Sequence, residues 1–362
     1  MFTVRILEVC MVAVVVQTVY YALTTPTVLC LAALAVLWGV YRRERRRAAG
    51  TIPLTGKHVL ITGCDTGIGH ELAKKLHQLG CHVIATVLLP DGEGAEELRD
   101  FGPARMTVLP LDVTSDDSVS KCLNTVKDMC SKTGLWGLVN NAGINAIGEL
   151  ELVTMRQYLH VANINIFGMV RTTRAFLPLI RQAKGRIVNV TSVHGKVSWP
   201  NNVAYSITKF AAETFSDITR LEMAQFGVKV VVIEPGGFGF STNVLEPSKL
   251  RSMAKEQWEC ASDEVKELYG KATLDRRLAA FEKTWASPAG PHRFPVTPVI
   301  DALTEALTSD DPELRYLVDG CLKQRFDVYC VLDGSITTLH SRPAFPSADT
   351  VQVSQQDFEV KV

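Results

Sequence analysis

The sequence predicts an α/β fold, with a doubly wound, Rossmann-type parallel sheet in a single domain that follows an N-terminal membrane helix or hairpin. Three observations carry this prediction. Short apolar segments alternate with segments of helical periodicity after residue 50, a glycine-rich turn joins the first such pair, and a long apolar run precedes them. Strands that alternate with helices build a parallel sheet with right-handed crossovers and helices on both faces. We therefore expect an anchor with a basic flank at 1–50, a main domain at 51–340 and a flexible tail at 341–362.

The N-terminal region reads as a membrane anchor. From Leu23 to Tyr41 the chain is about long enough to cross a bilayer as one helix, and the stretch from Val9 to Leu23 suits a second or re-entrant segment. Five arginines follow between 42 and 47, and positive residues beside a membrane helix favour the cytoplasmic side. A cleaved secretory signal is the alternative, but the length of the run and the missing small-residue cleavage pattern argue against it. We expect a retained anchor in contact with membrane lipid, and the main domain in the cytosol.

Composition excludes some classes of function. Lysine and arginine number 38, and aspartate and glutamate also 38, so the formal net charge is zero. No nucleic-acid partner is expected, because the one basic cluster adjoins an apolar segment rather than a basic groove. The nine cysteines include no Cys-x-x-Cys pair and no spacing typical of zinc, so no metal site is expected. Their odd number and expected burial favour a reducing compartment.

Six apolar segments after residue 50 have the length and composition of buried parallel strands. The first is followed by a helical pattern from Gly69 to Leu79, and the alternation continues along the chain. The expected strands are His58–Ile61, Cys81–Leu88, Met106–Leu111, Leu135–Val139, Gly185–Val190 and Val228–Ile233.

A glycine-rich turn lies between the first strand and the first helix, with the sequence Thr-Gly-Cys-Asp-Thr-Gly-Ile-Gly at 62–69. Glycine lets the backbone turn tightly and approach a pyrophosphate, and the helix amino terminus supplies free N–H groups and the positive end of its dipole. A glycine turn alone is a weak signal, and its place between a strand and a helix strengthens it. The residues expected to bind a dinucleotide here are Gly63, Asp65, Thr66, Gly67, Ile68 and Gly69.

The charges near the expected ribose site favour NAD over NADP. The acidic residue expected at the end of the second strand is absent, since Val87-Leu88-Leu89 stands there, and no arginine or lysine awaits a 2′-phosphate. Asp65 in the loop would repel that phosphate, although it could equally be a turn-capping residue. Asp112, just past the third strand, could contact the adenine or be the N-cap of the next helix.

The strongest functional signal lies between residues 192 and 209. Tyr205 and Lys209 have the i, i+4 spacing that places two side chains on one helix face, and Ser192 follows the fifth strand. A lysine ammonium beside a phenol favours the phenolate, so we expect the pKa of Tyr205 to fall toward the working pH. Such a base can take the hydroxyl proton of an alcohol while hydride leaves the carbon. Ser192 and Tyr205 are therefore the expected substrate contacts.

Asn165 lies upstream in a helical pattern, where its amide could hold a water that links Lys209 to solvent. A lone Tyr-x-x-x-Lys pair arises often by chance on exposed helices. Here the pair is accompanied by Asn165 and Ser192, and all four follow a glycine turn and the Asn-Asn-Ala-Gly sequence at 140–143. This combination argues against a chance occurrence.

In these motifs the segment from about Gly56 to Glu305 resembles the short-chain dehydrogenase/reductase family. The turn at 62–69 resembles its cofactor loop, the sequence at 140–143 its strand-stabilising motif, and the four side chains above its catalytic tetrad. The resemblance implies a Rossmann-type fold, a nicotinamide dinucleotide cofactor and interconversion of an alcohol and a carbonyl. It also implies dinucleotide contacts at Asn141, Tyr205, Lys209, Pro235, Gly236 and Thr242.

Finer detail resembles one branch of that family, whose members act on hydroxybutyrate, retinol and hydroxysteroids. The shared stretches include 62–65, 135–143 and 176–180, and matches at 203–215 and 297–302 favour the hydroxybutyrate enzymes. This branch mostly oxidises with NAD, and the resemblance also implies a homo-oligomer. The anchor resembles those of the retinol and steroid enzymes, which implies the endoplasmic reticulum membrane, with the mitochondrial inner membrane as the alternative.

The segment beyond Pro235 is expected to cover the substrate, as it does in the family. Each of its larger apolar side chains could line a pocket or pack on the sheet, namely Phe238, Phe240, Met253 and Trp258. A short hydroxy acid would need a cation for its carboxylate. His194 and Lys196, just after Ser192, are the candidates, and either could instead be merely solvent-exposed.

Three functions fit these features. The leading one is NAD-dependent oxidation of a secondary alcohol, with D-3-hydroxybutyrate as substrate and acetoacetate as product. The second is oxidation of retinol or of a 17-beta-hydroxysteroid, which a bilayer anchor suits because such alcohols partition into lipid. The third, a membrane protein that binds NAD without catalysis, leaves the complete set of four catalytic side chains unexplained.

Overall fold

The computed structural model describes residues 50–286 and 295–319, together with short stretches between 17 and 44. The chain divides into two compact units, Pro53–Thr308 with Pro312–Val362, and Met1–Ile52 with Ser309–Asp311. Most of the expected anchor and all of the expected tail lie outside the described residues. Among the helices that are described, none has the length and apolar character needed to span a bilayer.

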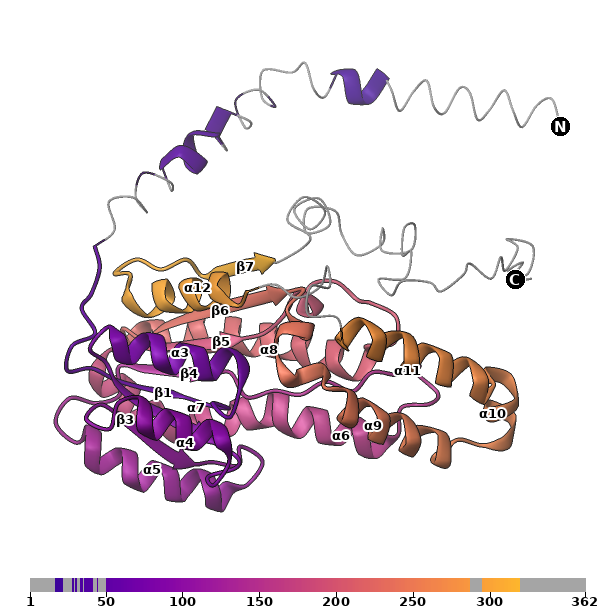
Figure 1. Ribbon diagram of the computed structural model, residues 1–362. Helices are drawn as coiled ribbons and strands as arrows, with labels where there is room; N and C mark the ends of the chain where they lie inside the picture. Colours follow the sequence, from indigo (N-terminus) through magenta and orange to yellow (C-terminus); the bar gives the residue numbers. More distant parts are fainter. Residues whose placement is uncertain are drawn as a thin grey trace. The chain divides into compact units, whose positions relative to one another are not determined.

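The larger unit is built on a parallel sheet in the order β3-β2-β1-β4-β5-β6-β7 (Figure 1). The order reverses direction beside β1, as in doubly wound nucleotide-binding folds. All six predicted strands are confirmed, the first with the predicted bounds and the others with ends shifted by at most three residues, and one further strand, β7, was not predicted. The strands are β1 His58–Ile61, β2 His82–Val87, β3 Met106–Pro110, β4 Gly137–Asn140, β5 Arg186–Val190, β6 Lys229–Gly236 and β7 Arg315–Asp319.

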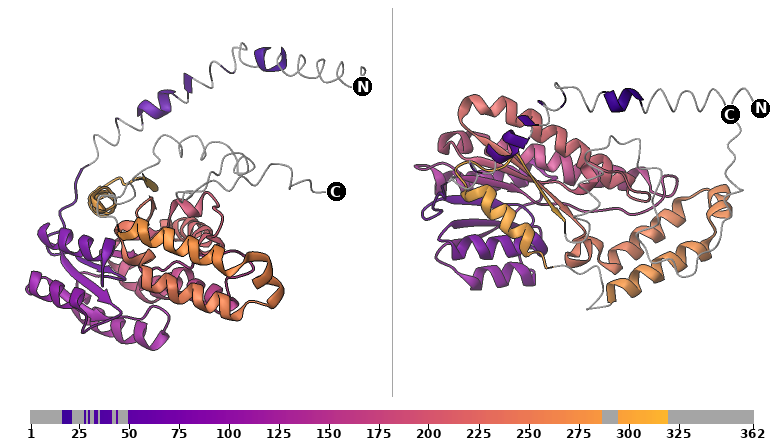
Figure 2. Two further views of the ribbon diagram at one scale, coloured as in Figure 1. Left: turned by 45° about the vertical axis from the view of Figure 1, so that its right-hand side comes forward. Right: turned by 90° about the horizontal axis from the view of Figure 1, so that it is seen from above.

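Helices cover both faces of this sheet, and α9, α10 and α11 lie to one side of it (Figures 1 and 2). Buried residues of α3 and α12 share one hydrophobic cluster with the sheet, while those of α5 and α7 share the other. The helices are α3 Gly67–Gln78, α4 Glu93–Phe101, α5 Asp116–Cys130, α6 Met155–Ala162, α7 Met169–Ala183, α8 Val203–Met223, α9 Pro247–Cys260, α10 Asp263–Tyr269, α11 Lys271–Ala286 and α12 Thr297–Thr308.

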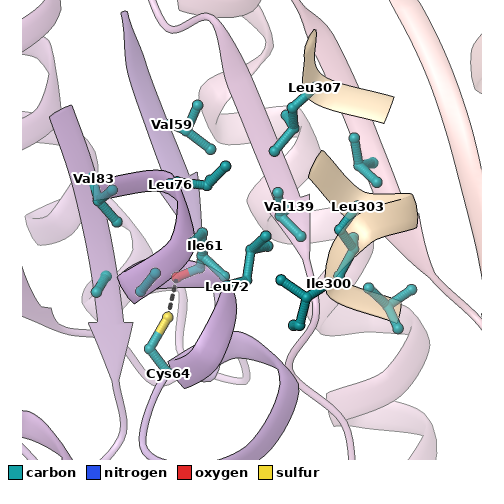
Figure 3. Close-up of a cluster of buried hydrophobic side chains, with 14 of the residues drawn as sticks. Val59, Ile61, Cys64, Leu72, Leu76, Val83, Val139, Ile300, Leu303 and Leu307 are labelled. Atoms are coloured by element: carbon teal, nitrogen blue, oxygen red, sulfur yellow. Dashed lines mark hydrogen bonds between the residues drawn. The ribbon is translucent and has the colours of Figure 1, made fainter. Parts of the chain in front are cut away.

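Strand β1 shows how the sequence divides between the two core layers. Val59 and Ile61 point into the cluster under α3 and α12, which is drawn in Figure 3, whereas Leu60 belongs to the opposite cluster. Successive side chains of a strand point to opposite faces, so a strand buried on both sides needs a continuous apolar run. All three side chains are fully buried. This explains why the strands appear in the sequence as short unbroken apolar segments.

A tryptophan braces the amino-terminal ends of the strands. The Trp136 ring, just before β4, lies between the Lys57 ammonium at 3.7 Å from its centroid and the Arg186 guanidinium carbon at 4.6 Å. Its Nε1 donates to the Leu307 carbonyl of α12 at 3.1 Å. Cation–π contacts of this kind stabilise by about 0.5–2 kcal/mol each. The brace therefore fastens α12 to the sheet edge remote from the carboxyl ends of the strands.

Helices α6 and α7 are joined by a π-helical turn, η1, at Asn163–Gly168. The backbone stays helical through both junctions, at Asn163 and at Met169, so α6, η1 and α7 form one continuous helix. A π-turn holds an extra residue, which turns local backbone and side-chain groups out of the α-helical pattern. Asn165 lies in this turn and is 1% exposed.

Helix α9 is fastened to α6 by buried amides. Gln257 of α9 donates through Nε2 to the Gln157 Oε1 at 3.0 Å and to the Ile147 carbonyl at 3.0 Å. Gln157 in turn donates to the Met253 carbonyl at 3.2 Å. Buried amides that satisfy one another in this way fix relative helix positions. The segment after β6 is thus held over the loop that follows β4.

Candidate active site

The glycine-rich turn leaves room for a phosphate group. Gly63 and Gly67 have φ values of +71° and +66°, the left-handed region that glycine adopts without strain. A Cβ at Gly69 would lie 2.4 Å from the Gly63 carbonyl oxygen and 2.5 Å from the Asn141 amide nitrogen, so only glycine fits there. The Thr66 N-cap uses no side-chain hydrogen bond, and the first turn of α3 holds no acidic residue. The uncapped N–H groups and the helix dipole therefore suit a pyrophosphate.

The residues after β4 support this turn from behind. Asn141 donates through Nδ2 to the carbonyls of Thr62 at 2.9 Å and Gly63 at 3.0 Å. The Thr62 hydroxyl accepts the backbone N–H groups of Asn141 and Ala142, both at 3.0 Å. Asn141 thus shapes the cofactor loop through the backbone, and Ile68 packs against the hydrophobic core. These contacts give the Asn-Asn-Ala-Gly sequence its structural role.

Asp65 reaches from the turn to the end of β2. Its carboxylate accepts the backbone N–H of Leu88 at 3.0 Å and that of Leu89 at 2.9 Å. A Cβ at Gly94 would lie 2.0 Å from the Asp65 carbonyl oxygen, so the amino terminus of α4 packs directly on this residue. Asp65 therefore places a negative charge where an acidic residue at the end of the second strand was expected and is absent. It also caps the turn, so the two readings of Asp65 are compatible.

Asp112 is not a helix N-cap, contrary to one of the two expected roles. Ser115 is the N-cap of α5, and its hydroxyl accepts the Ser118 N–H at 3.2 Å. Asp112 instead accepts the Thr114 N–H at 2.8 Å and the Thr114 hydroxyl at 2.7 Å. An aspartate that bonds the backbone two residues on forms an Asx turn. The turn after β3 is thereby fixed by Asp112, three residues before the N-cap of α5.

The segment after β6 returns to the glycine turn. Pro235 and Gly236 are the last residues of β6, at the carboxyl edge of the sheet. A Cβ at Gly67 would lie 3.4 Å from the Thr242 Cβ, so Thr242 stands against the amino terminus of α3. The Thr242 hydroxyl donates to the Phe238 carbonyl at 3.4 Å. The structure therefore brings the expected cofactor contacts of the two halves of the sheet together.

Ser192, Tyr205 and Lys209 meet at the carboxyl ends of β5 and β6. The Ser192 hydroxyl donates to the Pro235 carbonyl at 3.3 Å and is hydrogen-bonded to Tyr205. Ser192 is also the N-cap of the short helix η2, Val193–Gly195, where its hydroxyl accepts the His194 N–H at 3.2 Å. The Lys209 ammonium lies 5.3 Å from the Tyr205 ring centroid and donates to the Val190 carbonyl at 3.0 Å. One polar cluster thus contains three of the four expected catalytic groups.

The expected fall in the pKa of Tyr205 is wrong for the chain by itself. Burial raises the pKa of Tyr205 to about 12, and the hydrogen bond with Ser192 opposes this only in part. Burial also lowers the pKa of Lys209 to about 8, against the attraction of Glu213, which raises it. Desolvation disfavours the charged form of each group, and in this site it outweighs their local partners. Further positive charge beside the phenol is needed to favour the phenolate near neutral pH.

Asn165 clamps the loop that passes above Lys209. Its Oδ1 accepts the Ile144 N–H at 2.9 Å, and its Nδ2 donates to the Ile144 carbonyl at 2.9 Å and to the Thr208 hydroxyl at 3.1 Å. Thr208 precedes Lys209 on α8, and a Cβ at Gly143 would lie 3.8 Å from the Lys209 nitrogen. The π-turn residue therefore holds the chain after β4 against the catalytic helix.

Neither expected cation is available to a substrate carboxylate. The Lys196 ammonium is paired with two carboxylates, at 3.4 Å from a Glu213 oxygen and 3.7 Å from a Glu234 oxygen. Burial, and next the charge of Lys209, lower the pKa of His194 to about 4, so its imidazole is neutral near pH 7. His194 packs edge-on against Tyr205, with ring centroids 5.5 Å apart. The uncharged His194 ring therefore lies beside Tyr205.

The apolar side chains after β6 divide between core and site. Phe238 is 4% exposed and belongs to the main core, so it packs on the sheet. Met253 of α9 packs with Ala146, Val153 and Tyr158 over the loop after β4. Trp258 lies under the Lys271 ammonium at 5.9 Å. Of these three side chains, Met253 is the one that fits the expected role of covering the substrate. The side chain of Phe240 is outside the described residues.

Sequence reasoning missed a set of buried charges beside the catalytic helix. Glu213 and Glu234 are 5% and 4% exposed, and Arg315 of β7 contacts both. A glutamate at the end of the apolar strand Val-Val-Val-Ile-Glu, and another four residues after Lys209, were signals in the sequence. Charged residues at core positions normally indicate pairing or function.

Comparison with known proteins agrees with this geometry. Residues 57–251 match the family model described as short chain dehydrogenase. The chain is 42% identical to mitochondrial D-beta-hydroxybutyrate dehydrogenase of Rattus norvegicus over 72% of this chain and 76% of that protein. It is 39% identical to retinol dehydrogenase 7 of Rattus norvegicus over 80% of this chain and 88% of that protein.

The fold is also found among solved structures. A short-chain dehydrogenase from Streptomyces avermitilis superposes with a TM-score of 0.57 and 27% identity, covering 76% of this chain and 91% of the other. The family binds a nicotinamide dinucleotide and converts small-molecule substrates. Together with the motif match, the catalytic cluster and the parallel sheet, these likenesses show that the chain is a member of the short-chain dehydrogenase family and an alcohol oxidoreductase.

Proposed function

We propose that the protein oxidises an alcohol, in the leading case a secondary alcohol, with NAD as the acceptor. The observation that carries this proposal is the cluster of Ser192, Tyr205 and Lys209 at the carboxyl ends of β5 and β6. In this reaction the Tyr205 phenolate takes the hydroxyl proton, Ser192 hydrogen-bonds the same oxygen, and hydride leaves the carbinol carbon. When bound, NAD supplies the hydride acceptor and a positive charge beside the phenol. Asn165 is the fourth catalytic residue of the proposal, and a water held there would link Lys209 to solvent.

The choice of NAD rests on Asp65. Its carboxylate lies at the end of β2, against the N–H groups of Leu88 and Leu89, where the ribose of a dinucleotide in this fold is placed. A carboxylate there can accept the 2′-hydroxyl of NAD and repels the 2′-phosphate of NADP. The remaining cofactor contacts of the proposal are Gly63, Thr66, Gly67, Ile68, Gly69, Asp112, Asn141, Tyr205, Lys209, Pro235, Gly236 and Thr242.

Two substrates are candidates. D-3-hydroxybutyrate, which yields acetoacetate, is supported by the 42% identity to the rat hydroxybutyrate enzyme. A lipid alcohol such as retinol or a 17-beta-hydroxysteroid is supported by the site itself, because Lys196 is paired with two carboxylates and His194 is neutral. A carboxylate held without a cation would lose much of its binding energy. The charge of the site therefore favours the uncharged alcohol, and sequence identity favours the hydroxy acid.

The test is NADH formation by the full chain in detergent. NAD is supplied with D-3-hydroxybutyrate, all-trans-retinol or estradiol in separate assays, and absorbance at 340 nm is followed. Turnover of hydroxybutyrate alone supports the first candidate, and turnover of the lipid alcohols supports the second. A protein that binds NAD yet forms no NADH with any alcohol would overturn the proposal and favour a non-catalytic NAD-binding membrane protein.

We also propose that the apolar segment at 9–41 anchors the protein in membrane lipid of the endoplasmic reticulum, with the catalytic domain in the cytosol and the mitochondrial inner membrane as the alternative. The apolar run and the arginines at 42–47 support this.

Exposed apolar side chains along α6, η1 and α8 support a homo-oligomer, among them Leu159, Phe167, Ile207 and Leu221. Carbonate extraction of organelle fractions and light scattering in detergent test the two statements.

A further inference from the structure

Four charged side chains form a cluster beneath the catalytic groups, the ion cluster of Lys196, Glu213, Glu234 and Arg315. The Arg315 guanidinium contacts the Glu213 carboxylate and lies 3.2 Å from a Glu234 oxygen. The Lys196 ammonium lies within 4 Å of both carboxylates, at 3.4 and 3.7 Å. Two carboxylates and two cations thus lie together in a largely buried place.

Three members of the ion cluster, Lys196, Glu213 and Glu234, lie in or directly beside elements that carry part of the active site. Lys196 directly follows η2, whose N-cap is Ser192. Glu213 lies one helical turn after Lys209 on α8. Glu234 precedes Pro235, whose carbonyl accepts the Ser192 hydroxyl.

Arg315 adds the edge strand β7. This strand pairs with β6 in parallel register, with Glu234 opposite Leu317 and Pro235 opposite Val318. The guanidinium therefore reaches across β6 to α8, and its second nitrogen contacts Asp217 at 2.5 Å. An element that sequence analysis did not predict thus contributes the central cation.

The turn after Ser192 rests directly on the catalytic helix at this place. A Cβ at Gly195 would lie 2.9 Å from the Glu213 Cγ and 2.9 Å from the Lys209 carbonyl oxygen. The glycine therefore allows η2 and α8 to touch, and the Lys196–Glu213 pair closes the contact from the next residue. A shift of the Glu213 side chain would separate the element that carries Ser192 from the one that carries Tyr205 and Lys209.

The charges around Lys209 come from every element packed against it. Tyr205 and Glu213 face it from α8, His194 from η2, the Val190 carbonyl from β5, and the Gly143 backbone from the loop after β4. Among these, Glu213 is the group whose negative charge raises the pKa of Lys209, while burial lowers it. Glu213 itself faces Lys196, Arg315 and Glu234. The pKa of Glu234 is raised by burial and then by Glu213.

We propose that Glu213 is a positioning residue for the alcohol oxidation proposed above, on which this inference rests: held by Arg315 and Lys196, its carboxylate fixes η2 against α8 and keeps the Lys209 ammonium charged. It touches neither substrate nor cofactor in this role. It acts through Lys209 and through the Ser192 turn. Among the residues that the structure describes, none is a hydrogen-bond partner of the Glu213 Oε1, so a glutamine can keep its oxygen toward the two cations while the charge is removed.

The first experiment reads Lys209 without enzyme activity. The full chain is labelled with 13C-lysine in detergent, the Lys209 Cε signal is assigned with Lys209→Arg, and its pH midpoint is measured. In Glu213→Gln the midpoint should fall by about 0.5–1 pH unit, a three- to tenfold change in proton affinity, because a nearby negative charge is lost. Glu213→Asp, which keeps the charge, should restore most of the midpoint. Asp217→Asn, which removes an exposed carboxylate that also contacts Arg315, is the matched control and should leave it unchanged.

Lys196→Met should move the Lys209 midpoint in the opposite direction, and it changes a side chain that is partly exposed. Removing this cation leaves Glu213 less neutralised, so the Lys209 midpoint should rise. Steady-state kinetics are measured next. Glu213→Gln should lower kcat by about tenfold at pH 8 with the KM for NAD unchanged. As the pH is raised, the activity of this variant should begin to fall at a lower pH than that of the wild type.

The outcomes separate this inference from the proposed function. Midpoints and kcat that stay at wild-type values in Glu213→Gln would overturn the inference, as would an equal shift in Asp217→Asn. A wild-type protein that oxidises no alcohol while the Lys209 midpoints move as expected would sink the proposed function and leave the electrostatic link standing. A folded Glu213→Gln that loses NAD binding as well as kcat would show a general structural role and contradict the proposal.

Discussion

The Asp65 carboxylate accepts the backbone N–H of Leu89 at 2.9 Å, so a residue of the cofactor loop closes the end of the second strand. In the proposed binding mode, the loop that would approach the phosphates and the charge that would face the ribose are therefore parts of one turn. In folds of this class the acidic residue usually stands about 20 residues further on, at the strand end. Here apolar Leu88 and Leu89 occupy that position and are exposed.

Replacing Asp65 tests this arrangement. Asp65→Asn keeps one acceptor for the two N–H groups and removes the charge, so the ratio of kcat/KM for NADP to that for NAD should rise about tenfold, or about 1.4 kcal/mol. Both cofactors are measured with the same alcohol. Glu71→Gln removes an exposed carboxylate from the neighbouring helix and should leave the ratio unchanged. An unchanged ratio in Asp65→Asn would assign the residue to turn capping alone.

Tyr205→Phe tests the proposed base. Loss of the phenol removes the proton acceptor, and kcat should fall by about a hundredfold to ten-thousandfold, the usual contribution of general acid–base catalysis. NAD binding, followed by quenching of protein fluorescence, should be retained. Tyr269→Phe removes a surface hydroxyl that bonds Glu151 and serves as the control. Turnover at the wild-type rate in Tyr205→Phe would exclude the proposed mechanism.

The lowered pKa of His194 predicts that the protein loses stability in acid. Its folded pKa of about 4 lies below the ordinary value of 6.5, because burial and then Lys209 disfavour the charged ring. The unfolded chain takes up this proton first, so the free energy of unfolding falls as the pH drops from about 6.5 to about 4, by about 1–3 kcal/mol. Denaturant unfolding measured across this range checks it.

In His194→Gln this part of the pH dependence should disappear, since no imidazole remains to titrate. His160→Gln changes an exposed imidazole on α6 and is the control. A slope between pH 4 and 6.5 that is the same in the wild type and in His194→Gln would show that other groups govern acid stability.

Trp136→Phe tests the brace at the opposite end of the sheet. Phenylalanine keeps a ring between Lys57 and Arg186 but cannot donate to the Leu307 carbonyl. The free energy of unfolding should fall by about 1–3 kcal/mol, from a lost buried hydrogen bond and a weaker cation–π contact. Activity at 25 °C should persist, because the brace lies away from the carboxyl ends of the strands. Trp258→Phe, on α9, should change stability by less.

The sequence was informative where a fold property follows from local residues. Unbroken apolar runs such as 58–61 predicted strands buried on both faces, and the spacing of Tyr205 and Lys209 predicted their shared helix face. Strand β7 escaped because Arg315–Asp319 is short and polar at both ends, and its pairing with β6 supplies what its own sequence lacks.

The site was less predictable where long-range contacts decide it. The ion cluster joins positions about 100 residues apart in Arg315 and Glu213, and no periodicity records which buried charges will meet. The pKa of Tyr205 was expected to fall, because the i, i+4 lysine was visible in the sequence and the degree of burial was not. Likewise, the sequence placed Lys196 near Ser192, but only the structure shows that its ammonium is paired with the Glu213 and Glu234 carboxylates.

The π-turn at 163–168 makes the number of residues in this helix as important as their identity. Deleting one residue there, for example Ile166, would let α6 run into α7 as a regular α-helix with both packed faces still in phase. Such a protein would keep its core and its register while Asn165 lost its hold on Ile144. A chimaera with a gap in this turn would thus keep the fold and lose the placement of Asn165. An alignment with the same gap would hide this difference, because substitution scores at single positions do not record it.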